Sequence, residues 1–226
     1  LDNGLVGYWK LDEGRGGYAY DSSSNSNTGT LAGGMSATGW TAFTSSNSHT
    51  GSFVNPYSLE FDGTDDYIDM GNGSSMDVVA NPFSVSLWVK LAAQPAAGKI
   101  MNMLTKATLS YSGNGFGFGY DNRTTKSLDL YKAGLVDQDV NVTLSNDIWY
   151  YLIAVQGASS VTYYVNGVSI GSNSNSTPYQ SSAGQTAYIG GHTSYAEGVK
   201  FNGLIDDVRI YNRALTGSEI RMLAAG

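Results

Sequence analysis

The stretch FNGLIDDVRIY, residues 201–211, decides the fold expected for this chain of 226 residues. Apolar and polar side chains alternate along it, which is typical of a β-strand with one buried face. The alternation places Leu204, Val208 and Ile210 on one face, together with Asp206. The segment therefore predicts a long strand near the end of the chain.

The residues that follow, NRALTGSEIRML at 212–223, predict a short helix. Thr216 stands three residues before Glu219, which is the spacing of a helix capping box. A short apolar stripe comes next, formed by Ile220, Met222 and Leu223. We expect one regular helix near residues 215–223.

Asp206 is unusual because its neighbours on the predicted buried face are apolar. A lone buried carboxylate is costly, so it needs a cation or several hydrogen-bond donors. Three interpretations stay open: backbone amides satisfy Asp206, a β-bulge turns it outward, or it binds a metal ion.

Composition limits the partners. The net charge is -7, which argues against nucleic acid or an anionic membrane as the main partner. The chain has no cysteine, so a bound metal would have to use oxygen atoms or the two histidines, His49 and His192. Sixteen tyrosines and four tryptophans suit either sheet packing or stacking on sugars.

Short alternating runs separated by turn residues recur along the whole chain and predict an all-β fold. Residues 57–71 are expected to form a hairpin, and Asn166-Gly167 is a strong signal for another. We predict a two-sheet antiparallel jelly-roll β-sandwich with one short C-terminal helix, forming a single domain over residues 1–226. No stretch is long enough to insert into a membrane, and the start at Leu1 without a signal peptide suggests a piece of a longer protein.

The segment DSSSNSNTG carries oxygen-bearing side chains at every second position, at Asp21, Ser23, Asn25 and Asn27. This spacing would let a short loop surround a calcium ion. The segment lacks the glycine and glutamate of an EF-hand, and an ordinary polar turn is the alternative.

The sequence resembles the bacterial laminin G-like (LamG) domains of the concanavalin A-like lectin/glucanase superfamily. The resemblance rests on GLVGYWKLDEGRG with YDSSSNSNTGTL at 4–31, YSLEFDGTDDYIDM at 57–70, FSVSLWVKL at 83–91 and FNGLIDDVRIYNRALTGSEI at 201–220. It implies that the first and last strands are neighbours. It also implies a structural calcium ion, with candidate ligands Asp21, Asn25, Asn27 and Asp206.

Some relatives with this architecture are glucanases, so catalysis has to be considered. A retaining glycosidase needs two carboxylates about 5 Å apart. The run Glu60-Phe61-Asp62 begins the Glu-x-Asp pattern of laminarinase-like enzymes, but no second glutamate follows it. We therefore expect no enzymatic activity and no catalytic residue.

The favoured function is carbohydrate binding, as a lectin-like module of a larger secreted or cell-surface protein. Candidate ligand-binding residues lie at strand ends or in loops, where ligands are usually met: Tyr120, Asn122, Arg123, His192 and Tyr195. The partner would be a carbohydrate or a cell-surface glycan. An adhesion or spacer module that binds protein, or no ligand, is the alternative.

Overall fold

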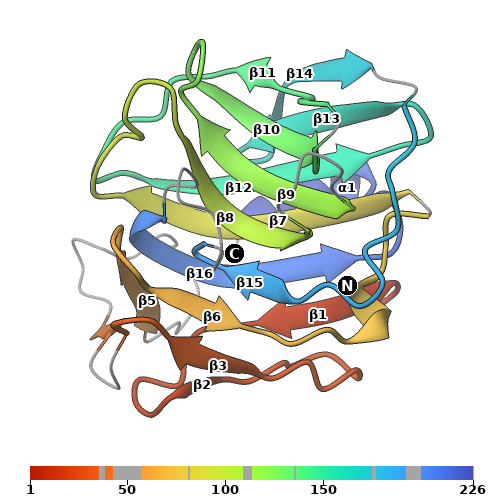
Figure 1. Ribbon diagram of the computed structural model, residues 1–226. Coiled ribbons are helices and arrows are strands. Elements are labelled where there is room, and N and C mark those ends of the chain that lie inside the picture. Colours follow the sequence, from red (N-terminus) through yellow and green to blue (C-terminus); the bar gives the residue numbers. More distant parts are fainter. Residues whose placement is uncertain are drawn as a thin grey trace.

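The computed structural model describes residues 1–35, 39–42, 57–80, 82–108, 114–134, 136–174, 177–191 and 200–225. The described chain forms two antiparallel sheets that pack face to face (Figure 1). His49, His192 and Tyr195 lie outside the described residues.

The first sheet, sheet A, has the strand order β14-β13-β12-β7-β16-β5-β4, with β1 also paired to β16. Its strands, in chain order, are β1 (Leu5–Trp9), β4 (Trp40–Ala42), β5 (Tyr57–Asp62), β7 (Phe83–Leu91), β12 (Trp149–Gln156), β13 (Ser160–Val165), β14 (Val168–Ser174) and β16 (Asn202–Tyr211). The pairing of β1 with β16 confirms that the first and last strands are neighbours.

The second sheet, sheet B, has the order β11-β10-β9-β8-β15-β6-β3-β2. Its strands, in chain order, are β2 (Tyr18–Ala19), β3 (Gly29–Ala32), β6 (Tyr67–Asp69), β8 (Ile100–Ala107), β9 (Gly115–Asp121), β10 (Ser127–Lys132), β11 (Val140–Asn141) and β15 (Ala187–Ile189). A 3₁₀ helix, η1 (Ser74–Met76), follows β6.

The core lies between the sheets. In β9, with the sequence GFGFGYD, Phe116, Phe118 and Tyr120 are fully buried in this core. The alternating glycines put Gly117 and Gly119 on the outer face of sheet B. A Cβ atom at Gly117 would lie 2.1 Å from the ring of Tyr131, so glycine is needed where that ring crosses β9.

The face assignment predicted for β16 is wrong in its first half. Ile205, rather than Leu204, lies in the core with Val208 and Ile210. The cause is a β-bulge between Asp206 and Arg209, where Asp207 has a φ of 52°. An extra residue in one strand shifts the alternation by one position.

The hairpin predicted for residues 57–71 is also wrong. β5 pairs with β4 and β16 in sheet A, whereas β6 pairs with β3 and β15 in sheet B. The connection between them therefore carries the chain from one sheet to the other. The hairpin predicted at Asn166-Gly167 is confirmed: it joins β13 to β14, and both residues have positive φ, as a type I′ turn requires.

The predicted helix is confirmed as α1 (Gly217–Ala225), whose buried residues are Ile220 and Leu223. The backbone N–H of Thr216 donates to Glu219 Oε2 at 2.8 Å, and the Thr216 hydroxyl accepts from the Glu219 N–H at 3.4 Å, which completes the capping box. No helix in the described part of the chain is long and apolar enough to cross a membrane.

Glu219→Gln should weaken the docking of α1 slightly and in a pH-dependent way. Two hydrogen bonds from the Arg213 guanidinium, at 2.9 and 2.6 Å, help hold the pKa of Glu219 at about 2. Because the folded pKa lies below the ordinary value of 4.5, this stabilisation is present above pH 4.5 and is lost as the pH falls towards 2. Both side chains touch solvent, so we expect a loss of only about 0.5–1 kcal/mol in urea unfolding at neutral pH. A difference that stays constant below pH 3 would contradict this explanation.

Candidate functional site

Arg123, one of the predicted ligand-binding residues, follows β9 and lies among three carboxylates. Its Nε donates to both oxygens of Asp121, at 3.1 and 3.0 Å. Its Nη2 lies 2.8 Å from Asp121, 3.0 Å from Asp129 and 2.9 Å from Asp137. Asp129 comes from β10, between the core residues Leu128 and Leu130, so its side chain leaves the core and lies on the outer face of sheet B.

The four groups differ strongly in exposure. The side chain of Asp129 is completely buried, whereas those of Arg123 and Asp137 are 37% and 52% exposed. Burial raises the pKa of Asp129 well above its ordinary value, and the nearby charge of Asp137 adds to the shift. The accessible part of the cluster is therefore a guanidinium donor beside a carboxylate acceptor.

Tyr120 and Asn122, also predicted to bind ligand, have structural contacts. Tyr120 is fully buried, and its hydroxyl accepts a hydrogen bond from the backbone N–H of Leu144 at 3.0 Å. It therefore offers no ring face to a ligand in this structure. The Asn122 side chain donates to the Pro95 carbonyl at 2.8 Å, which ties the end of β9 to the loop between β7 and β8.

A cross-strand row of side chains runs over the outer face of sheet B, and sequence reasoning missed it. Successive Cα partners connect seven strands, from β2 through β3, β6, β15, β8 and β9 to β10. The row consists of Tyr18, Thr30, Asp69, Tyr188, Thr105, Gly117 and Tyr131. These residues are far apart in the sequence, so only the sheet register brings them into line. Together they form a row of phenol rings and short polar groups, of which Tyr188, Thr105 and Gly117 are buried.

The row is exposed to solvent at the β2 end and buried in the middle. Tyr18 and Thr30 on β2 and β3 are exposed, whereas Thr105 has no exposed surface. Among the described residues the Thr105 hydroxyl has no hydrogen-bond partner. The Tyr131 hydroxyl donates to Asn102 Oδ1 at 2.8 Å, across the surface of β9.

The predicted metal-binding loop folds around the carboxylate of Asp21. Asp21 Oδ1 accepts hydrogen bonds from the backbone N–H groups of Tyr8 and Ser23. Asp21 Oδ2 accepts from the Ser23 hydroxyl, from the Asn27 N–H and from the Asn27 amide. Sequence reasoning predicted that the alternating polar side chains could surround a calcium ion, with a polar turn as the alternative, and these hydrogen bonds do not decide between the two.

The loop side chains also converge on a backbone atom that the sequence analysis did not predict. The register of β1 against β16 is irregular between Leu5 and Gly7. The carbonyl oxygen of the intervening Val6 accepts from the Ser23 hydroxyl at 3.3 Å and from the amides of Asn25 and Asn27 at 3.1 and 3.0 Å. A bulge commonly releases such a group from the ladder.

This set of atoms fits a hard divalent cation. Oxygen atoms that share one calcium ion, each 2.3–2.6 Å from it, lie roughly 3 Å from one another. Val6 O, Asp21 Oδ2, the Ser23 hydroxyl and the terminal atoms of Asn25 and Asn27 have contacts of 2.8–3.3 Å among them. A half-turn of each amide would replace its N–H group by a carbonyl oxygen at the same position.

Asp206, the fourth predicted metal ligand, is fully buried on β16 beside the bulge. Trp9 of β1 is the partner of Val208 on one side and of Asp21 on the other. The backbones of β16 and of the Asp21 loop are therefore about 10 Å apart, which is two strand spacings. β1 therefore lies between the Asp21 loop and the strand that carries Asp206.

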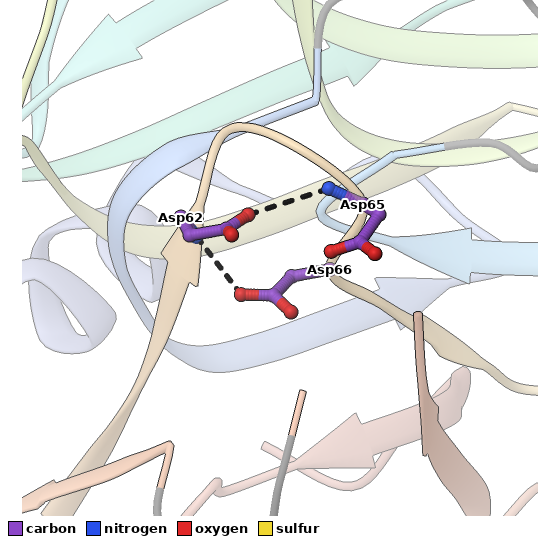
Figure 2. Close-up of side chains that lie close together, drawn as sticks. All are labelled: Asp62, Asp65 and Asp66. Atoms are coloured by element: carbon purple, nitrogen blue, oxygen red, sulfur yellow. Dashed lines mark hydrogen bonds between the residues drawn. The ribbon is translucent and has the colours of Figure 1, made fainter. Parts of the chain in front are cut away.

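A second acidic cluster, at the connection between β5 and β6, was not predicted. Asp62, Asp65 and Asp66 each place a carboxylate oxygen within 4.8 Å of the others (Figure 2). Asp62 Oδ1 accepts from the N–H groups of Thr64 and Asp65, and Asp66 Oδ2 accepts from the N–H of Asp62. Burial acts to raise the pKa of Asp62, but these backbone donors outweigh it and lower the pKa. The cluster therefore shapes the turn that carries the chain between the sheets.

With this geometry established, comparison with known proteins gives the family. A family model described as the concanavalin A-like lectin/glucanases superfamily matches residues 62–221. The chain belongs to this superfamily. The match includes Arg123 and β16, and it begins after the Asp21 loop. A search of curated proteins finds no match.

Several solved structures share the fold. Domain 4 of AbnA, a GH43 extracellular arabinanase from Geobacillus stearothermophilus in complex with arabinotriose, has a TM-score of 0.69 and 20% identity over 97% of this chain and 98% of that chain. The binding domain of botulinum neurotoxin DC in complex with SialylT has a TM-score of 0.68 and 13% identity, covering 99% of this chain and 51% of the other. Trypanosoma rangeli sialidase in complex with sialic acid has a TM-score of 0.66 and 17% identity, covering 98% and 33%. The chain thus spans about half of the toxin chain and a third of the sialidase chain.

Proposed function

We propose that this chain is a non-catalytic carbohydrate-binding module of a larger secreted or cell-surface protein, and that residues 1–226 form one domain. The observation that carries the proposal is the pair formed by Arg123 and Asp137 beside the outer face of sheet B. A sugar hydroxyl both donates and accepts hydrogen bonds, so it can bind a guanidinium and a carboxylate held side by side. Hydrogen bonds to charged groups are among the stronger ones in proteins.

The pair is held in place before a ligand arrives. Asp121 and Asp129 fix Nε and Nη2 of Arg123, and Asp137 accepts a further hydrogen bond from Nη2 at 2.9 Å. Ordering these side chains in the free protein removes part of the entropy cost of binding. The sugar complexes among the structures that share the fold support a carbohydrate as the ligand class.

The same geometry supports a non-catalytic role. A glycosidase needs an acid and a second carboxylate that both reach the substrate. Asp129, whose pKa is raised, has no exposed surface and is bridged to Asp137 by Arg123. In the Glu-x-Asp run, the lowered pKa of Asp62 makes this residue a poor general acid.

Asp137→Asn should weaken glycan binding without unfolding the protein. The change removes the charge of the exposed acceptor, and a hydrogen bond to a charged group contributes about 1.5–3 kcal/mol, so affinity should fall about tenfold or more. The measurement is a titration of the isolated domain with arabinotriose, a sialylated trisaccharide and glycans selected on an array. Asp139→Asn, two residues away, is the control for loss of one negative charge. Equal affinities for the wild type and Asp137→Asn would refute the site, and failure of every glycan to bind would refute the function.

We also propose that the Asp21 loop binds a structural calcium ion. Its ligands would be the side chains of Asp21, Asn25 and Asn27 together with the Val6 carbonyl, and Asp206 is a further candidate from across β1. The support is the set of contacts around the Val6 carbonyl and Asp21 Oδ2, whose lengths fit oxygen atoms around one ion. The ion would fasten β1, which pairs with the last strand, to the loop that precedes β3.

A further inference from the structure

Tyr18 on β2, the edge strand of sheet B, and Tyr20 directly after this strand form an exposed aromatic pair. Their side chains are 53% and 58% exposed, and the intervening Ala19 is fully buried in the core. The two phenol rings therefore share the outer face, with centroids 6.2 Å apart and an interplanar angle of 31°. Among the described residues, the other exposed large apolar side chains are all non-aromatic.

The pair is accessible and its backbone is fixed. A Cβ atom at Gly16 or Gly17 would meet nothing within 4 Å, so the chain just before Tyr18 borders open space. The Trp40 indole donates to the Gly16 carbonyl at 3.0 Å, and Glu13 Oε1 accepts from the Tyr20 N–H at 2.8 Å. These bonds hold the segment in place and leave the rings in solvent. Exposed aromatic groups that contribute little to packing are typical of binding surfaces.

The neighbouring groups favour a sugar over a protein strand. β2 has only two residues, Tyr18 and Ala19, which is too short to pair with an added strand. The outer-face row continues from Tyr18 to Thr30 and Asp69, which offer hydrogen-bonding groups. A phenol ring provides an apolar face for sugar C–H groups and a hydroxyl at its edge.

The charges nearby argue against an anionic ligand. Glu13 accepts from the Tyr20 N–H, and Asp69 lies two strands from Tyr18 in the row. Arg15 is the nearby cation in the sequence, and the whole chain carries a net charge of -7. We propose that Tyr18 and Tyr20 form a second carbohydrate-binding site, which takes a neutral oligosaccharide. The site lies six strand spacings from β10, roughly 29 Å along the sheet, and so is separate from the Arg123 site. The inference rests on the proposed carbohydrate-binding function.

The test is an NMR titration of the ¹⁵N-labelled domain, which follows the backbone amide signals as arabinotriose, cellotriose, mannotriose or a sialylated trisaccharide is added. At least one neutral probe should shift the amides of residues 18–20, and the sialylated probe should leave them unmoved. The double variant Tyr18→Ala/Tyr20→Ala should weaken this response about tenfold or more, whereas Tyr18→Phe/Tyr20→Phe should retain most of it. Asp137→Asn should leave it unchanged, because the two sites are far apart.

The outcomes separate this inference from the function proposed above. Shifts near Arg123 with none at residues 18–20 would overturn the second site and leave the first. Shifts at residues 18–20 alone would overturn the Arg123 site and support the second. Equal shifts with the sialylated probe would overturn the neutral ligand class. Loss of self-association in the alanine double variant, with glycan binding unchanged, would assign the pair to contact with a second copy of the chain.

Discussion

Arg123→Met should lower the free energy of unfolding by about 3 kcal/mol at neutral pH. The substitution leaves Asp121, Asp129 and Asp137 without the guanidinium that joins them, and Asp129 is completely buried. Removing one partner of a buried ion pair typically costs 3–5 kcal/mol. Because the Arg123 side chain is 37% exposed, we expect a loss at the lower end of this energy range.

The loss should shrink at acid pH. Burial already raises the folded-state pKa of Asp129 above its unfolded value, and removal of Arg123 should raise it further. A carboxyl with a raised folded pKa destabilises the fold above that pKa, and the cost is relieved as the pH falls towards its unfolded pKa of about 3.9. Urea unfolding of wild type and Arg123→Met at pH 7 and about pH 5 measures the difference. Arg123→Lys keeps the positive charge but loses the planar guanidinium that binds several carboxylates at once, so its free energy of unfolding should lie between those of the wild type and Arg123→Met. An equal or larger loss at pH 5 would contradict this account of the cluster.

Calcium should raise the melting temperature of the wild-type domain by about 5–10 °C. An ion that binds only the folded state adds about 2.7 kcal/mol at a concentration one hundredfold above Kd. For a domain of this size, each kcal/mol corresponds to about 2–4 °C. Calorimetry of metal-free protein, with calcium and with chelator, measures the shift.

Two aspartate variants identify where the ion binds. Asp21→Ala should melt at the same temperature with and without calcium, because the loop loses its carboxylate. Asp65→Asn alters the acidic cluster between β5 and β6, and calcium should still raise the melting temperature of this variant by the full amount. Loss of the response in Asp65→Asn but not in Asp21→Ala would move the site to the turn between β5 and β6. Equal melting curves for metal-free wild type in both conditions would remove the calcium proposal.

The fold could be predicted where one residue or one local pattern determines the structure. The Asn166-Gly167 turn and the capping box of Thr216 and Glu219 need only neighbouring residues, and both are confirmed. A β-bulge at Asp206 was one of three open interpretations, and the sequence could not select it because the bulge depends on how β16 pairs with β7. The hairpin predicted for residues 57–71 was wrong for a similar reason. Alternation indicates that a segment is a strand, but it does not indicate which strand pairs with it.

The candidate site was less predictable, because its partners come from distant segments. The alternating oxygen-bearing residues from Asp21 onwards indicated a loop that could surround an ion. The Val6 carbonyl could not be predicted, because an irregularity in the pairing of β1 with β16 frees it from the ladder. The burial of Tyr120 could have been predicted, since it shares the alternation of Phe116 and Phe118 in β9.

The most direct test of the central claim combines glycan titration of the ¹⁵N-labelled domain with chromatography of the glycans recovered afterwards. The account predicts saturable shifts confined to the outer face of sheet B and its edges, with every oligosaccharide recovered intact. Absence of shifts with all glycans, shifts confined to sheet A, or shortened glycans in the recovered sample would contradict a non-catalytic carbohydrate-binding module.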